Sequence, residues 1–71
     1  MIWMAFHGRA DIGPDGRAQG MKEIFRDTTF SAGSETEAIA VCDAIAVEVI
    51  AEYGQPIVAV LDTEEGWKGR E

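Results

Sequence analysis

The sequence has one cysteine, one histidine and no asparagine among its 71 residues. A single cysteine cannot form a disulfide within the chain, so nothing in the sequence indicates an oxidising compartment. Without asparagine, the chain has no acceptor for N-glycosylation. A zinc site typically takes three or four nitrogen or sulfur ligands, and the sequence has only His7 and Cys42. We therefore expect neither a metal ion nor a cofactor.

The sequence also lacks a long hydrophobic run. Its first apolar segment, residues 1–6, is far shorter than the core of a signal peptide or a membrane span, and no basic residue precedes it. We therefore expect a cytoplasmic protein that does not enter a membrane. The length predicts one domain over residues 1–71, near the lower limit for a chain that folds around a single core. Hydrophobic residues make up 46% of the chain, which argues against disorder.

Basic residues are scarce in the second part of the chain. Residues 31–71 contain two basic and nine acidic residues, and this imbalance accounts for the whole net charge of −7. An acidic surface repels phosphate backbones, so we expect no nucleic-acid binding unless Arg9, Arg17, Lys22 and Arg26 form a basic face. The acidic surface suits a basic protein partner, although it also simply keeps a small protein soluble.

Residues 34–53 predict one long helix. Ser34 and Glu37 fit a capping box, in which the serine hydroxyl accepts a hydrogen bond from the Glu37 amide and the glutamate reaches back to Ser34. The segment contains no proline. It is followed by Gly54, which can close a helix in a left-handed conformation, and by Pro56, which prevents the helix from resuming.

Three further segments have the composition of strands. Residues 2–7 alternate along the chain, residues 21–30 are rich in Ile, Phe and Thr, and residues 57–61 form an uninterrupted apolar run. Such a run is typical of a strand covered on both faces. Turn residues at 13–16 predict that the first two strands form a hairpin. Residues 63–66 predict a turn, after which Trp67 begins a charged tail.

This order of elements predicts an α+β fold of the ββαβ type. We expect a three-stranded sheet in the order 2-1-3, with the third strand antiparallel to the first and the long helix packed on one face. A sheet with the second strand in the centre is the alternative.

The turn also predicts a register for the hairpin. A ladder centred on residues 14–15 would place Met4 opposite Phe25 and would bring Arg26 near Trp3, close enough for a cation–π contact. A bulge in the connection would move this register by a residue or two.

The sequence contains more apolar surface than one helix can cover. The helix can cover only one face of the sheet, yet both faces contain apolar side chains, and large exposed apolar patches tend to mark interfaces. We therefore predict a two-fold homodimer that buries the uncovered sheet face. The residues expected at this interface are Trp3, Ala5, Ile24, Val58, Val60 and Trp67. A stripe on the helix formed by Ala40, Ala44, Val47 and Ala51 is the alternative interface.

No set of residues predicts catalysis. His7 and Cys42 would need to lie within hydrogen-bond distance to act as a nucleophilic pair, and nothing in their spacing supports this. We expect His7 to pack on a strand face or to be exposed, and Cys42 to be a small core residue. Asp62, Glu64 and Glu65 lack the spacing of a calcium loop and predict a solvated turn. We therefore predict no catalytic residue and no enzymatic activity.

The passage into the helix resembles that of small bacterial proteins with the ββαβ order. Residues 30–39, Phe-Ser-Ala-Gly-Ser-Glu-Thr-Glu-Ala-Ile, contain the Thr/Ser-x-x-Glu-Ala-Ile step that opens the helix in two groups. One group consists of uncharacterised bacterial ββαβ domains, which carry a Trp in the second strand and Asp-Gly after the last. This chain has no Trp in that strand, and Glu65-Gly66 stands in for the second feature. The other group consists of antitoxins with a partial RNase H-like fold.

These resemblances supply no catalytic residue, and the antitoxin resemblance implies a basic toxin as partner. Taken with the composition, they predict a small acidic protein-interaction or regulatory module that is homodimeric. One alternative is a small-molecule-binding protein with a pocket between helix and hairpin and with His7 at its mouth. The other is an antitoxin-like partner of a basic protein.

Overall fold

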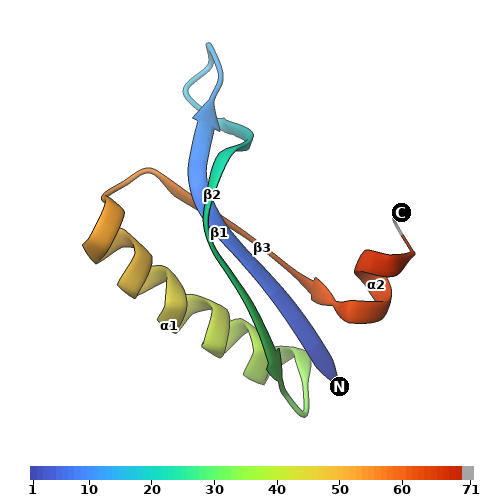
Figure 1. Cartoon of the computed structure of the whole chain (residues 1–71). Helices are drawn as coiled ribbons and strands as arrows, with labels where there is room; N and C mark the ends of the chain where they lie inside the picture. Colours follow the sequence, from blue (N-terminus) through green and yellow to red (C-terminus); the bar gives the residue numbers. More distant parts are fainter. Residues whose placement is uncertain (70–71) are drawn as a thin grey trace.

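The computed structural model describes residues 1–69 and contains a three-stranded sheet with one long helix along one of its faces (Figure 1). The elements follow in the order β1 (Ile2–Ile12), β2 (Ala18–Ser31), α1 (Glu35–Tyr53), β3 (Ile57–Thr63) and α2 (Glu64–Lys68). The strands lie in the order β2-β1-β3, and β1 is antiparallel to both neighbours. The predicted α+β class and strand order are confirmed, and the order with the second strand in the centre is wrong. Within residues 1–69, no helix is long and apolar enough to cross a membrane.

Helix α1 begins and ends at the predicted signals. The Ser34 hydroxyl accepts a hydrogen bond from the Glu37 amide at 3.2 Å. The Glu37 carboxylate accepts one from the Gly33 amide at 2.8 Å, one residue before the position that a capping box predicts. At the other end, Gly54 has a φ of 79°, which favours glycine, and its amide donates to the Ile50 carbonyl. Local signals are therefore enough to delimit this helix.

The hairpin is longer than predicted and has a different register. Register shifts occur between His7 and Gly8, between Arg9 and Ala10, and at the end of β1. Each shift inserts an extra residue in β2, so the displacements accumulate along the ladder. The predicted drift of a residue or two was therefore too small.

The accumulated shift separates the side chains that were expected to meet at the start of β1. Trp3 lies opposite Phe30 and makes no contact of the predicted kind with Arg26. Arg26 instead donates to the carboxylates of Glu48 at 3.0 Å and Glu52 at 3.2 Å, which ties β2 to α1. The predicted Arg26–Trp3 contact is wrong because the register is wrong. Met4, for the same reason, lies opposite Thr29 and not Phe25.

Arg9 on β1 closes the C-terminal end of α1. Its guanidinium donates to the carbonyls of Tyr53 at 2.8 Å and Gly54 at 3.2 Å. The same group lies 5.1 Å from the centre of the Phe25 ring, which stacks on the Tyr53 ring at 4.2 Å. Since the last turn of α1 contains no basic residue, this strand residue supplies the positive charge that a helix C-terminus favours.

Helix α1 covers the face of β1 that carries Trp3, Ala5 and His7. Trp3 is 8% exposed and packs in the core with Ala32 and Ala38, and Ala5 and His7 are fully buried. The prediction that Trp3 and Ala5 lie on the uncovered face is therefore wrong. Strand β1 has apolar side chains on both faces, and alternation alone does not say which of the two the helix covers.

Strand β3 is an edge strand. Its composition had suggested a strand covered on both faces, and that prediction is wrong. Ala59 and Val60 are both exposed. The strand extends to Thr63, whose hydroxyl accepts a hydrogen bond from the Gly66 amide at 2.9 Å and caps α2. The predicted turn and the start of the predicted tail therefore form a short helix, and the last two residues of that tail lie outside the described residues. A threonine followed by two acidic residues was the signal for this helix.

Candidate interaction surface

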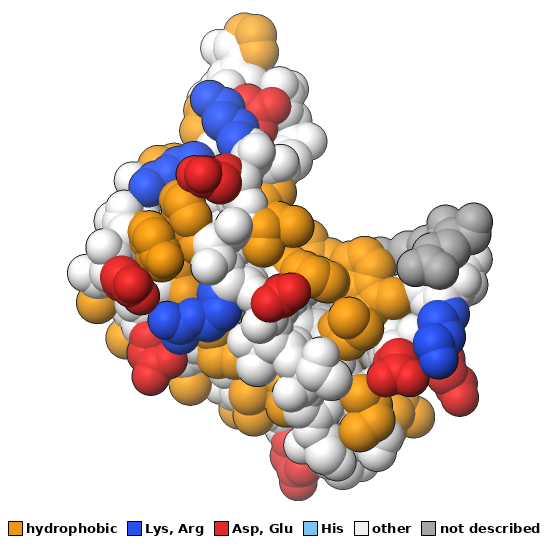
Figure 2. Space-filling view, in the orientation of Figure 1, with side chains coloured by type: hydrophobic (Ala, Val, Ile, Leu, Met, Phe, Trp, Pro, Cys, Tyr) orange, Lys and Arg blue, Asp and Glu red, His pale blue; other side chains and the backbone are white. Residues whose placement is uncertain are grey.

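The uncovered face of the sheet contains a hollow whose lining, among residues 1–69, consists only of hydrophobic side chains. Its volume is about 260 Å³, and it is lined by Phe6, Met21, Ile24, Val60 and Trp67. These five residues, here called the apolar hollow, come from all three strands and from α2. Figure 2 shows hydrophobic side chains gathered between the hairpin and α2. An apolar surface at this place is unexplained by packing within the described chain and marks a candidate binding site.

Phe6 occupies the middle of the apolar hollow because β1 is the central strand. It lies opposite Val60 on β3 and opposite Asp27 on β2. The Trp67 ring meets the Phe6 ring edge to face, with centroids 5.0 Å apart and planes at 86°. Helix α2 is thereby held against the uncovered face, where it forms one wall of the apolar hollow.

Gly8 allows Met21 to reach the apolar hollow. A Cβ atom at Gly8 would lie 2.7 Å from Met21 Sδ and would overlap the Glu23 carbonyl. Only glycine leaves room for this approach of β2 to β1. The methionine can therefore lie across the central strand, and its flexible side chain can adapt to a bound surface.

Four of the six predicted interface residues lie on this side of the molecule. Ile24 is 58% exposed, Val60 is exposed, and Val58 shares its strand face with Val60. Trp67 belongs to the apolar hollow. Their role in an interface remains a prediction. Sequence reasoning missed Phe6 and Met21, although the alternation of β1 already separates Phe6 from Trp3.

The electrostatic surroundings of the apolar hollow are acidic. Asp27 is exposed beside Phe6 and forms no ion pair with any residue in 1–69. On α2, Lys68 is paired with Glu64 at 3.1 Å. A cation that approaches the hollow would therefore meet an unneutralised carboxylate, in a chain whose net charge is −7.

The alternative interface on α1 is also exposed. Val47 is 68% exposed, and Ala40, Ala44 and Ala51 face solvent on the same helix. These side chains are small, and Glu48 lies among them. The uncovered sheet face is the better candidate because its hollow is lined by large side chains, including the aromatic rings of Phe6 and Trp67.

His7 and Cys42 lie together in the core, although nothing in their spacing indicated it. His7 Nε2 is 2.9 Å from the Cys42 carbonyl oxygen and 3.5 Å from Cys42 Sγ. Because a carbonyl can only accept, Nε2 carries the proton, and the buried Nδ1 has no hydrogen-bond partner within residues 1–69. Burial raises the pKa of the Cys42 thiol, and the Asp43 carboxylate raises it further. The expected core position of Cys42 is confirmed.

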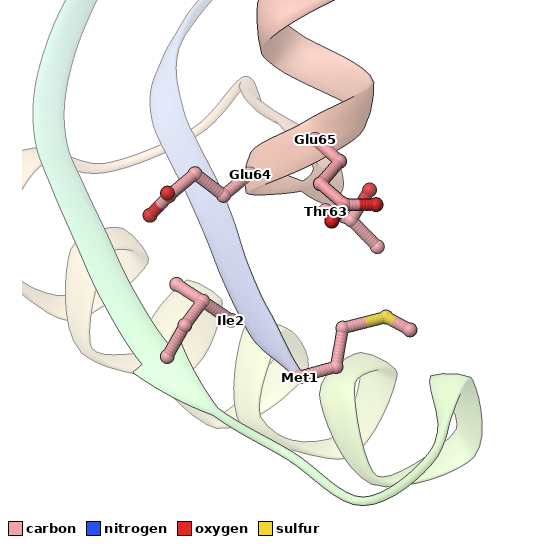
Figure 3. A pocket seen from close by; sticks show the side chains of 5 residues that line it. All are labelled: Met1, Ile2, Thr63, Glu64 and Glu65. Atoms are coloured by element: carbon pink, nitrogen blue, oxygen red, sulfur yellow. The ribbon is translucent and has the colours of Figure 1, made fainter.

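A second hollow lies where the start of the chain meets α2. It has a volume of about 180 Å³, and Figure 3 shows Met1 and Ile2 on one side and Glu64 and Glu65 of α2 on the other. Within residues 1–69, no group of three His, Cys, Asp or Glu residues is placed to hold a metal ion. The Asp62 carboxylate instead accepts a hydrogen bond from the next amide at 2.7 Å. Neither of these two hollows lies between α1 and the hairpin, and His7, which was expected at the mouth of such a pocket, is buried in the core.

Comparisons of the chain with protein-family models, with curated proteins and with solved structures found no significant match.

Proposed function

We propose that this chain is a non-enzymatic, homodimeric protein-interaction module whose apolar hollow binds a basic segment of a partner protein. The observation that carries the proposal is the uncovered sheet face, where five hydrophobic side chains from four elements enclose a hollow of about 260 Å³. Burial of such a surface is the main driving force of protein association.

The lining of the apolar hollow favours a protein partner over a small molecule. Small-molecule sites usually enclose about 300–1,000 Å³ and place a few polar groups that orient the ligand. This hollow is smaller, and its lining side chains are all hydrophobic. A row of apolar side chains on a helix or strand of another protein needs no such polar groups.

The charge of the chain favours a basic partner. The net charge is −7, and Asp27 lies opposite Phe6 of the apolar hollow without an ion pair to any residue in 1–69. A segment with apolar side chains toward the hollow and lysines or arginines at its rim would satisfy both features. If two copies met hollow to hollow, the acidic residues around the two hollows would face each other and their carboxylates would stay unneutralised.

The geometry of the buried His7–Cys42 pair supports a non-enzymatic role. A cysteine nucleophile needs a lowered thiol pKa and a base that can take its proton. Here the pKa of Cys42 is raised, and His7 Nε2 already donates to a backbone carbonyl. The pair is therefore arranged as core packing and does not activate the thiol.

Titration with two designed helical peptides tests this proposal. A fluorescently labelled amphipathic peptide of leucine and lysine should bind, as measured by anisotropy, and the matched peptide of leucine and glutamate should not. Ile24→Lys should weaken binding at least about tenfold, because it removes an exposed apolar contact and adds a like charge. Val47→Lys makes the same kind of change on the outer face of α1 and should leave binding unchanged. Equal binding by both peptides, or equal loss in both variants, contradicts the proposal.

A further inference from the structure

The two edges of the sheet differ in how well they are protected against pairing with another strand. Strand β2 carries three register shifts against β1 and has charged side chains at residues 22, 23, 26 and 27. Bulges and charges are the devices that keep an edge strand from pairing. Strand β3 pairs with β1 without a shift and has no charged residue in 57–61. Its edge is unprotected.

The alternation of the β1–β3 ladder shows which backbone groups of β3 point to this free edge. The Ala10 amide donates to the Pro56 carbonyl at 3.2 Å, so residues 56, 58, 60 and 62 direct their backbone groups toward β1. Ile57, Ala59 and Leu61 therefore direct theirs outward. No hydrogen bond from within residues 1–69 reaches these three amides. They form a ready template for a further strand.

We propose that β3 of one copy pairs antiparallel with β3 of a second copy about a two-fold axis at Ala59. Ala59 then lies opposite Ala59 of the second copy, and Ile57 lies opposite Leu61, which allows about six backbone hydrogen bonds. This inference rests on the homodimer of the proposed function and names the surface on which the two copies meet. It replaces the sheet face that the sequence had predicted for the dimer.

The charges of β3 permit pairing with a second copy in this register. Asp62 of one copy would lie opposite Pro56 of the other, which places the two Asp62 residues about 20 Å apart along the strands. That distance exceeds the screening length of about 8 Å at physiological salt, so two acidic chains can pair there without opposed carboxylates. The uncharged residues 57–61 meet only one another.

The proposed pairing leaves the apolar hollows free. A two-fold axis perpendicular to the sheet puts both copies of α1 on one face and both hollows on the other. Val60 would lie opposite Val58 of the second copy, and both side chains point to the uncovered face. The dimer would therefore present the two hollows next to each other on one six-stranded sheet.

Proline substitution tests the edge pairing, because the Ala59 amide points away from β1. Ala59→Pro removes an outward donor and leaves the β1 ladder intact, so the wild type should have twice the 7.7 kDa chain mass by light scattering and the variant should be monomeric. Thr29→Pro is the matched control. The Ala32 amide donates to the Met1 carbonyl, just before β1, and amides alternate in direction along a strand, so the Thr29 amide points to the free edge of β2. This variant should therefore remain dimeric.

Ala59→Glu serves as a second variant in case the proline prevents folding, which circular dichroism would show. It would place two carboxylates opposite each other on the axis and should raise the dimer dissociation constant at least tenfold. A monomeric wild type, a folded Ala59→Pro or Ala59→Glu dimer of wild-type affinity, or a monomeric Thr29→Pro overturns the proposal. Binding of the leucine–lysine peptide is measured separately, so failure of edge pairing is distinguishable from failure of the apolar hollow.

Discussion

The substitution Val49→Ala measures how much of the stability of this small chain comes from packing of α1 on the sheet. Val49 is fully buried on the inner side of the helix. Removal of two methyl groups costs about 0.8 kcal/mol each in lost burial, and the cavity left behind adds to it. The expected loss is about 2–3 kcal/mol. For a domain of this size the whole free energy of unfolding is about 4–11 kcal/mol, so the melting temperature should fall by about 10–20 °C.

Val47 provides an internal control for this experiment. It lies on the same helix and is 68% exposed, so Val47→Ala should change the free energy of unfolding by less than about 0.5 kcal/mol. Both variants would be unfolded in urea and followed by circular dichroism at one protein concentration, since a dimer makes stability depend on concentration. Equal destabilisation by the two substitutions would refute the assigned orientation of α1.

Two further predictions concern the core and the hairpin. Burial raises the pKa of the Cys42 thiol, and Asp43 adds to the effect, so the thiol should react with Ellman's reagent only on unfolding. The free energy of unfolding should fall above about pH 9, because the unfolded chain loses the thiol proton first. Rapid labelling of the folded protein would contradict this. Gly8→Ala should lower the free energy of unfolding by more than about 2 kcal/mol in the same urea assay, because its Cβ would overlap the Glu23 carbonyl. A Cβ at Gly20 meets nothing within 4 Å, so Gly20→Ala should be neutral. Equal effects of the two alanines would remove the steric argument.

The elements with strong local signals were predictable from the sequence. The serine before α1 and the glycine after it delimit the helix, and the turn at residues 13–16 joins two strands that do pair. The strand order was one of two that the sequence left open, since the preferred hand of the helical crossover determines the side on which the helix packs and not the order of the strands. These features depend on neighbouring residues or on general topology, which the sequence contains directly.

The remaining features depend on contacts between distant residues. The hairpin register was predicted wrongly because three bulges add up along β2, and no local motif marks them. Trp3 was assigned to the wrong face because β1 is apolar on both, and only the packing of α1 decides between them. The approach of His7 to Cys42 joins residues 35 positions apart. The apolar hollow was missed in part because Trp67 reaches Phe6 only through α2, which was expected to be a tail.

Strand β3 would serve both proposed surfaces with different chemical groups. Its side chain at Val60 lines the apolar hollow, whereas the backbone of Ala59 faces the free edge. A substitution that changes only the side chain on the uncovered face therefore affects the hollow, and one that removes an outward amide affects the edge. In the proposed dimer the two Val60 residues lie about 8 Å apart, because each is one residue from the axis and the two are therefore offset by two residues along the paired strands. A partner with two apolar segments could then occupy both hollows, and the second contact would form at the high effective concentration set by the first. Dimerisation would in this way strengthen binding at a site to which the edge itself contributes no contact.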